Sequence, residues 1–227
     1  MITSDLGDEG ALSPTERSTV RRHPDRAQAD RRALDAVLDS GLLAHIGFVD
    51  ESGQPFVIPV AYARDGDRLL VHGSTGSRLL RHLATGAAAC VTVTHIDGVV
   101  VARSAFNSSM NYRSALVFGS FHRLEGHEAA TAVDVITNHL IPGRVSEVRA
   151  NTKKELAATM VLALDLTEAS VKVRAGGPSD EPEDLEAPVW AGVVPTRLTA
   201  SKAEPGDSRA ALLPIPESVR TLIAKLS

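Results

Sequence analysis

The sequence has little of several things, and each shortage excludes a class of protein. A single cysteine, Cys90, excludes an internal disulfide framework and leaves no cysteine pair for a metal or redox motif. No apolar run approaches the roughly 20 residues that span a bilayer. Residues 1–10 are acidic and lack the basic and apolar regions of a signal peptide. We therefore expect a cytoplasmic protein that has no membrane partner.

Basic charge is also scarce. The 227 residues carry a formal net charge of −4, and only five of the 24 basic residues are lysine. Such a chain offers no broad positive field to nucleic acid, so we expect no nucleic-acid partner. The eight histidines show no HExxH or other helical ligand pair, and we expect no metal site. The composition, 43% hydrophobic and 23% charged, is that of a globular protein.

Short β-rich runs separated by turn signals dominate the chain. Asp-Gly and Ser-Gly turns join several of these runs, which favours antiparallel hairpins and a small barrel over a doubly wound sheet. The pattern predicts strands over 42–49, 55–63, 68–73, 87–96, 99–106, 112–124 and 160–175, with a turn at Asp97-Gly98. It predicts helices from about 28 to 40 and over 77–85, 126–140, 152–158 and 216–226.

Three regions follow from this pattern. Residues 1–25 are polar and without sustained period, and we expect a flexible arm. Residues 26–175 form the barrel domain. Residues 176–227 begin with an acidic, Pro/Gly-rich linker (176–188) and continue as a C-terminal extension.

The stretch HGSTGSRLLRHL (72–83) has the chemistry of an anion site. Gly73 and Gly76 allow left-handed backbone angles and close approach of N–H groups, and Ser77 is placed to cap the helix that follows. Arg78 opposes the helix dipole unless an anion lies nearby. The same stretch equally fits a capped amphipathic helix that binds nothing, and it is neither a P-loop nor a GxGxxG motif.

Longer stretches carry a family resemblance. The segment VIPVAYARDGDRLLVHGSTGSRLLRHLATGAAACVTVT (57–94) resembles the flavin-nucleotide-binding split-barrel proteins related to pyridoxamine 5′-phosphate oxidase, and within them the nitroimidazole-resistance (Nim) proteins. The segments DGVVVARSAFNSSMNYRSALVFGSFHRLEG (97–126), TKKELAATMVLALDLTEASVKVR (152–174) and PVWAGVVP (188–195) follow in the order of that branch.

The resemblance implies a mainly β fold with flanking helices, a six-stranded antiparallel split barrel. It also implies a homodimer that holds FMN in two clefts at the subunit interface. It places the phosphate on a turn made of Ser74, Thr75, Ser77 and Arg78, where the planar fork of an arginine suits a phosphate. It places the flavin ring along a strand that contains Val57, Ile58, Pro59, Val60 and Tyr62.

Five further residues are implied by the resemblance to serve the flavin. His72 and Tyr112 are the candidates for tuning the flavin or touching substrate. Arg113 and Ser114 would reach the cofactor from the partner subunit, and Trp190 is the tryptophan of the family's W-x-G element. Each has a structural alternative: a half-exposed histidine, a structural tyrosine, ordinary strand residues, or a tryptophan that covers an apolar patch.

Two functions remain open from the sequence. The first is an FMN-dependent oxidoreductase that acts on a small planar acceptor, whose identity the sequence does not give. The alternative is a non-catalytic flavin- or haem-binding split-barrel protein for storage or sensing. After the W-x-G element the true oxidases carry Arg-Leu-His, whereas this chain has Arg197-Leu198-Thr199. Oxidation of pyridoxamine phosphate is therefore not expected.

Overall fold

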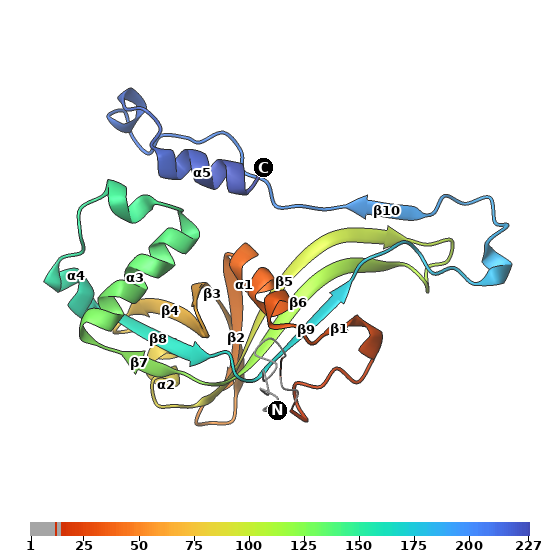
Figure 1. Ribbon diagram of the computed structural model, residues 1–227, viewed down its shortest axis with the longest axis horizontal. Helices are drawn as coiled ribbons and strands as arrows, with labels where there is room; N and C mark the ends of the chain where they lie inside the picture. Colours follow the sequence, from red (N-terminus) through yellow and green to blue (C-terminus); the bar gives the residue numbers. More distant parts are fainter. Residues whose placement is uncertain (1–11, 13–14) are drawn as a thin grey trace, which may run out of the picture.

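Figure 1 shows the computed structural model of the protein, which describes residue 12 and residues 15–227. An antiparallel sheet forms its centre; one helix packs across the middle of the sheet, and the other helices lie around it. The strands of the described residues are β1 (Ala27–Gln28), β2 (Leu43–Val49), β3 (Pro55–Asp65), β4 (Arg68–Ser74), β5 (Ala88–Val101), β6 (Ser109–Ser120), β7 (His122–Leu124), β8 (Thr159–Asp165), β9 (Ala169–Arg174) and β10 (Gly192–Pro195).

The helices of the same residues are α1 (Arg31–Ser40), α2 (Arg78–Leu83), α3 (Gly126–Leu140), α4 (Lys153–Ala158) and α5 (Glu217–Lys225). None of them is long and apolar enough to cross a membrane. The predicted fold class, mainly β with flanking helices, is confirmed.

The strand order is β1-β9-β6-β5-β2-β3-β4-β8-β7, and β10 pairs with β5 outside this path. The described strands number ten rather than the six expected. The short strands β1, β7 and β10 add to the count, and so does a break within the last predicted long strand.

That break separates β8 from β9. The sequence predicts one strand over 160–175, but the chain turns at residues 166–168, where the Leu166 N–H donates to the carbonyl of Asp67 at 2.8 Å. β8 pairs with β4, whereas β9 pairs with β6. The turn therefore moves the chain from the part of the sheet beside β4 to the part beside β6.

Asp97-Gly98 is not the predicted hairpin turn. The pair lies inside β5, at a register shift opposite β6 that is typical of a β-bulge. The Asp97 carboxylate accepts two hydrogen bonds from Arg113, at 2.9 and 3.0 Å. A Cβ on Gly98 would lie 3.1 Å from the carbonyl oxygen of Val194 in β10, so the glycine allows β10 to approach closely.

The larger core joins α1 and α2 to the sheet. Asp30 caps α1 by accepting a hydrogen bond from the Arg32 N–H at 2.8 Å, and the buried face of the helix presents Leu34 and Leu38. A smaller core lies under α3, where Ile136 packs against strand residues such as Leu70. These two cores hold α1 and α3 on the sheet.

The described part of the N-terminal arm lies against β9 and the turn before it. Arg17 forms an ion pair with Glu168, with nitrogen–oxygen distances of 2.6 and 2.7 Å, and Lys172 donates to the carbonyl of Arg22 at 2.9 Å. The remaining residues of the predicted arm lie outside the described residues.

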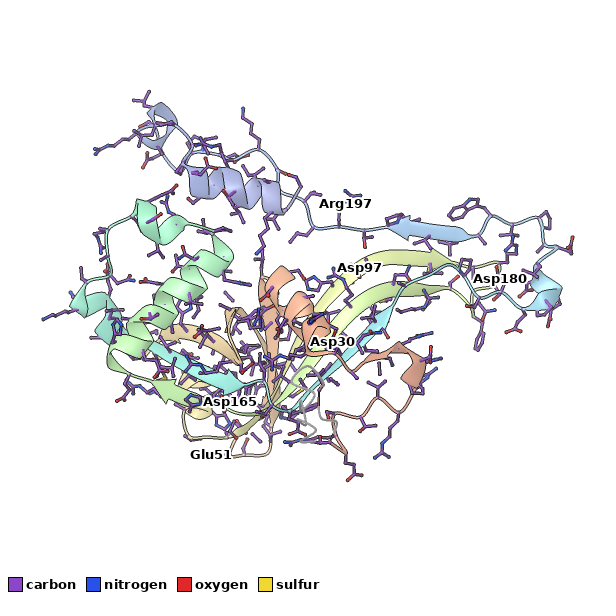
Figure 2. All side chains as sticks on the ribbon, viewed as in Figure 1. Asp30, Glu51, Asp97, Asp165, Asp180 and Arg197 are labelled. Carbon is purple, nitrogen blue, oxygen red and sulfur yellow. The ribbon has the colours of Figure 1, made fainter. Side chains whose placement is uncertain are left out.

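Segment 176–188, predicted to be a linker, is attached to the end of the long β5–β6 hairpin. The Asp180 carboxylate, 2% exposed, accepts hydrogen bonds from the backbone N–H and the guanidinium of Arg103, both at 2.7 Å. The carbonyl of Gly176 accepts a hydrogen bond from Asn111 at 3.0 Å. Figure 2 shows Asp180 at this far end of the hairpin, from which β10 returns along β5.

Asp180→Ala is expected to release this segment. The substitution removes two hydrogen bonds, one of them between charged groups, which lowers the local opening free energy by about 2 kcal/mol. Cleavage by a glutamate-specific protease at Glu183 and Glu186 should then be at least about tenfold faster, because cleavage follows the open population. Asp184→Ala in the same segment is the control and should digest as the parent does. Equal rates for the Asp180 variant and the parent would contradict the attachment.

Candidate functional site

The hydrogen-bonded ladder between β3 and β4 stops part of the way along both strands. The two strands pair from Asp65–Arg68 as far as Tyr62–Val71. Beyond that point, residues 55–61 of β3 pair with β2 alone, and residues 72–74 of β4 pair with β8 alone. One edge of β3 is therefore open over residues 55–61. We give the name "the split" to this open edge of β3 together with the neighbouring residues 72–78, which do not pair with β3.

The residues of β3 alternate between the two faces of the sheet. Val57 is 67% exposed and Pro59 is exposed, whereas Ile58 packs against the larger core. Proline has no N–H, so its pair with His45 cannot exchange two backbone hydrogen bonds. In an antiparallel ladder, pairs that exchange two backbone hydrogen bonds alternate with pairs that exchange none, and in the second kind the N–H groups point away from the partner strand. The pair of Pro59 is of the second kind, and so are the pairs of Val57 and Ala61, each two residues away. The N–H groups of Val57 and Ala61 therefore point to the open edge.

Tyr62 and Val60 belong to the core through their side chains. Tyr62 is fully buried, its hydroxyl donates to the carbonyl of Leu38 at 2.5 Å, and burial raises its pKa. Val60 packs against the larger core. A ligand in the split would therefore meet backbone and the side chains of Val57 and Pro59, not the ring of Tyr62.

The turn after β4 is held by its own polar groups. The Gly76 N–H donates to Ser74 Oγ at 3.1 Å, and the Leu80 N–H donates to Ser77 Oγ at 3.4 Å. The Thr75 N–H donates to the carbonyl of Ala158 at 3.0 Å. Ser77 thus caps α2 as predicted, but α2 has six residues, so its dipole adds little to anion binding.

The predicted left-handed angles of this turn are absent. Neither Gly73 nor Gly76 is among the glycines with positive φ. Gly73 serves packing instead, because a Cβ there would lie 2.9 Å from the Leu80 side chain.

Arg78 is exposed but oriented. Its guanidinium lies 2.9 Å from Asp50 Oδ2 and 4.9 Å from the ring centroid of Phe56, and its side chain is 70% exposed. Asp50 also accepts hydrogen bonds from Ser52 and Gln54. The Ser52 hydroxyl contributes most to lowering the pKa of Asp50, with smaller contributions from backbone N–H groups and Arg78. Arg78 is therefore held beside the split with free N–H donors.

His72 is the first residue of β4 beyond the ladder with β3. Its side chain is exposed, yet neighbouring protein atoms displace enough water to lower the pKa of the imidazole. No charged or hydrogen-bonding group contributes to this shift among the described residues. The ring is therefore neutral near pH 7, and both nitrogens are available to a ligand.

The other predicted residues lie elsewhere in the same chain. Tyr112, Arg113 and Ser114 are on β6, which β2 and β5 separate from β3, roughly 14 Å away at the spacing of strands. Arg113 is paired with Asp97, and the Ser114 hydroxyl donates to a β9 carbonyl at 3.4 Å. One chain thus does not bring these residues to the split.

Trp190 precedes β10 and is 65% exposed. Its ring lies over the backbone of Gly192, where a Cβ would stand 2.9 Å from the ring. The glycine of the W-x-G element is therefore required by the position of its own tryptophan.

Asp50 and Phe56 were missed by sequence reasoning. Asp50 belongs to the β2–β3 turn, which the sequence marks only as a turn, and Phe56 reads as an ordinary strand residue. Nothing in the local sequence indicates that both contact Arg78, since the contacts join segments more than 20 residues apart. The end of the β3–β4 ladder had one signal, Pro59, because proline is tolerated at open edges.

The family comparison covers most of the chain. A family model described as pyridoxamine 5′-phosphate oxidase matches residues 30–173, which include the sheet from α1 to β9. A search of curated proteins gave no match.

Solved structures extend the match beyond the family model. A FAD and haem binding protein from Mycobacterium smegmatis is 44% identical, over 87% of this chain and 97% of that chain, with a TM-score of 0.84. The flavocytochrome Anf3 from Azotobacter vinelandii is 36% identical, over 92% and 98%, with a TM-score of 0.85. A putative 5-nitroimidazole antibiotic resistance protein from Bacteroides thetaiotaomicron, 19% identical over 65% and 86% with a TM-score of 0.56, shares the fold. The chain therefore belongs to the pyridoxamine 5′-phosphate oxidase family, whose sequence pattern and split-barrel sheet it carries.

Proposed function

We propose that this protein binds a flavin nucleotide in the split and uses it as a redox protein. The observation that carries the proposal is the end of the β3–β4 ladder at Tyr62–Val71. It leaves an open backbone edge beside a turn that carries the hydroxyl side chains of Ser74, Thr75 and Ser77, and beside Arg78, which Asp50 orients. A flavin has two matching parts, a planar ring edged with hydrogen-bonding groups and a phosphate.

The residues of the split fit both parts. The open N–H groups of Val57 and Ala61, with the carbonyls between them, would pair with the edge of the ring. The exposed side chains of Val57 and Pro59 would lie near it. Ser74, Thr75, Ser77 and Arg78 would hold the phosphate, with Arg78 supplying a planar pair of donors. FMN is the smallest nucleotide that satisfies this set.

A homodimer would complete the site. Tyr112, Arg113, Ser114 and Trp190 are too far from the split of their own chain, and a second copy would bring its set there. Exposed apolar side chains support this arrangement on the strands between, with Leu43 50% and Ile96 54% exposed. Large exposed apolar surfaces commonly mark interfaces.

The bound flavin would supply hydride and electron transfer, and the protein would bind and orient the flavin and supply the electrostatic environment. Among the residues of the split, neutral His72 is the titratable side chain nearest the ladder end, so it would donate or accept a hydrogen bond at the ring or at a small planar acceptor. Tyr112 of the partner copy would contact the same acceptor. This arrangement favours a flavin-dependent oxidoreductase.

A flavin protein that also binds haem is the second candidate. One observation favours it: the two structures described above at 44% and 36% identity are named for haem or as a flavocytochrome. In that case the protein would store, sense or relay electrons rather than turn over a substrate.

The visible absorption spectrum of the purified protein, followed by titration of the flavin-free protein with FMN, tests the proposal. We expect flavin bands and uptake of one FMN per chain. An additional Soret band would select the second candidate. A protein without chromophore that takes up no FMN would overturn the flavin site.

A further inference from the structure

A second gap in the sheet lies along β5, on the edge opposite to the one that pairs with β6. β2 pairs with this edge as far as Thr92, and β10 pairs with it from Gly98 onwards. Residues 93–97 therefore have no strand partner on this edge among the described strands. A cavity of about 370 Å³ lies here, which is within the size range of small-molecule sites. We call this cavity the β5 gap.

The C-terminal extension brings two positive side chains to the β5 gap. Arg197 follows β10, and Lys225 is the last residue of α5. Figure 2 shows Arg197 on the segment that lies beside Asp97 of β5. Neither cation forms an ion pair within the described part of the chain, although Lys225 donates to the carbonyl of Asp39 at 3.5 Å.

No carboxylate of the β5 gap is free to balance these charges. Among the described residues that line the cavity, only Asp97 carries a carboxylate, and both of its oxygens accept hydrogen bonds from Arg113. Two positive charges thus remain without a negative partner at the gap. They favour a ligand that carries a negative charge.

Apolar side chains form the other walls of the β5 gap. They are Leu43 at the start of β2, Ile96 on β5 and Leu198 on the extension, and Leu198 is 70% exposed. An inorganic anion would leave this surface in water, whereas a ligand with an apolar body would cover it. Leu43 and Ile96 also belong to the surface assigned above to a second copy, which would then form the outer wall of the gap.

We propose that the β5 gap binds an aromatic carboxylate, a small acid with a planar apolar body. Arg197 would pair with the carboxylate through its planar pair of donors, and Lys225 would add a second positive charge. The ring would lie against Leu43 and Ile96, because a flat body suits a space between two strand ends. The acid would thereby join the C-terminal extension to β2 and β5. This site is separate from the split and goes beyond the proposed flavin function.

Isothermal titration calorimetry of the full chain with cinnamate, a planar aromatic carboxylate, tests this site. We expect cinnamate to bind at least about tenfold more tightly than the neutral cinnamamide, the change expected from one charge-assisted hydrogen bond. Arg197→Ala should lose at least about tenfold in affinity for cinnamate and none for the amide. Its unfolding curve should match that of the parent, because Arg197 is exposed.

Arg209→Ala is the matched control. Arg209 is an exposed arginine of the same extension that does not line the β5 gap, so this variant should bind cinnamate as the parent does. An excess of inorganic phosphate should not displace cinnamate from the parent, since phosphate has no apolar body.

The outcomes separate this site from the flavin site. No binding of cinnamate, equal affinities for cinnamate and its amide, or an unchanged affinity in Arg197→Ala would each overturn the carboxylate site. Displacement by phosphate would reduce the gap to a plain anion site and overturn the aromatic ligand. A protein that binds cinnamate and no FMN would keep this site and overturn the proposed function, and uptake of FMN without cinnamate would do the reverse.

Discussion

Gly41→Ala is expected to destabilise the protein by about 3 kcal/mol. Gly41 follows α1, and a Cβ there would overlap the Tyr62 hydroxyl and lie 2.8 Å from Val93 Cγ1. Overpacking of a buried site costs about 1–3 kcal/mol. Displacing the Tyr62 hydroxyl would also break its hydrogen bond to the carbonyl of Leu38, which would keep only the Gly41 N–H as a donor, at a cost of about 1 kcal/mol. The melting temperature should fall by about 10 °C for a chain of this length.

Chemical unfolding of Gly41→Ala and of three further variants tests this. Gly206→Ala is the control, because nothing lies within 4 Å of a Cβ there, and it should change stability little. Tyr62→Phe removes the hydroxyl and should cost about 1 kcal/mol alone. In the Gly41→Ala background it should cost less or restore stability, since the group that clashes is gone. An additive double variant would contradict the clash and point to Val93 instead.

Arg78→Ala is expected to lower the affinity for FMN about a hundredfold. A charge-assisted hydrogen bond contributes about 1.5–3 kcal/mol, and Arg78 is the arginine that we propose holds the phosphate. The fold should hardly change. Arg78 is largely exposed, its ion pair with Asp50 contributes little, and Asp50 keeps its bonds to Ser52 and Gln54. Fluorescence titration of the flavin-free variant measures the change.

Arg78→Lys separates charge from geometry. Lysine keeps the charge but loses the planar pair of donors, so we expect a loss of about tenfold, between the parent and Arg78→Ala. Unfolding curves of both variants should match the parent. Unchanged FMN affinity in Arg78→Ala would remove the phosphate from this turn.

Local sequence signals predicted most of the elements. The helix over 126–140 begins and ends as predicted, because Gly126 and Pro142-Gly143 bound a clear helical period. Elements whose limits depend on distant partners were less predictable. Asp97-Gly98 has the composition of a turn, but Arg113 and β10 engage it inside a strand. The break between β8 and β9 likewise follows from a change of pairing partner, which no local pattern records.

The candidate site divides in the same way. The sequence could suggest the Ser74–Arg78 turn as an anion site, because glycine, hydroxyl and arginine residues are the types that such a site uses. The sequence could not suggest the split, because the split arises from the point at which β3 and β4 stop pairing. Residues 112–114 and Trp190 were selected by resemblance alone, and in the proposed site a second copy of the chain would supply them.

The open edge of β3 also bears on solubility. An unpaired strand edge invites another chain to add a strand, which leads to aggregation. Pro55 and Pro59 lie four residues apart in β3, both at positions where a backbone N–H would point to that edge. Each removes a donor that an incoming strand would need. The edge therefore resists pairing with another protein strand, while the N–H groups of Val57 and Ala61 stay open to a small molecule.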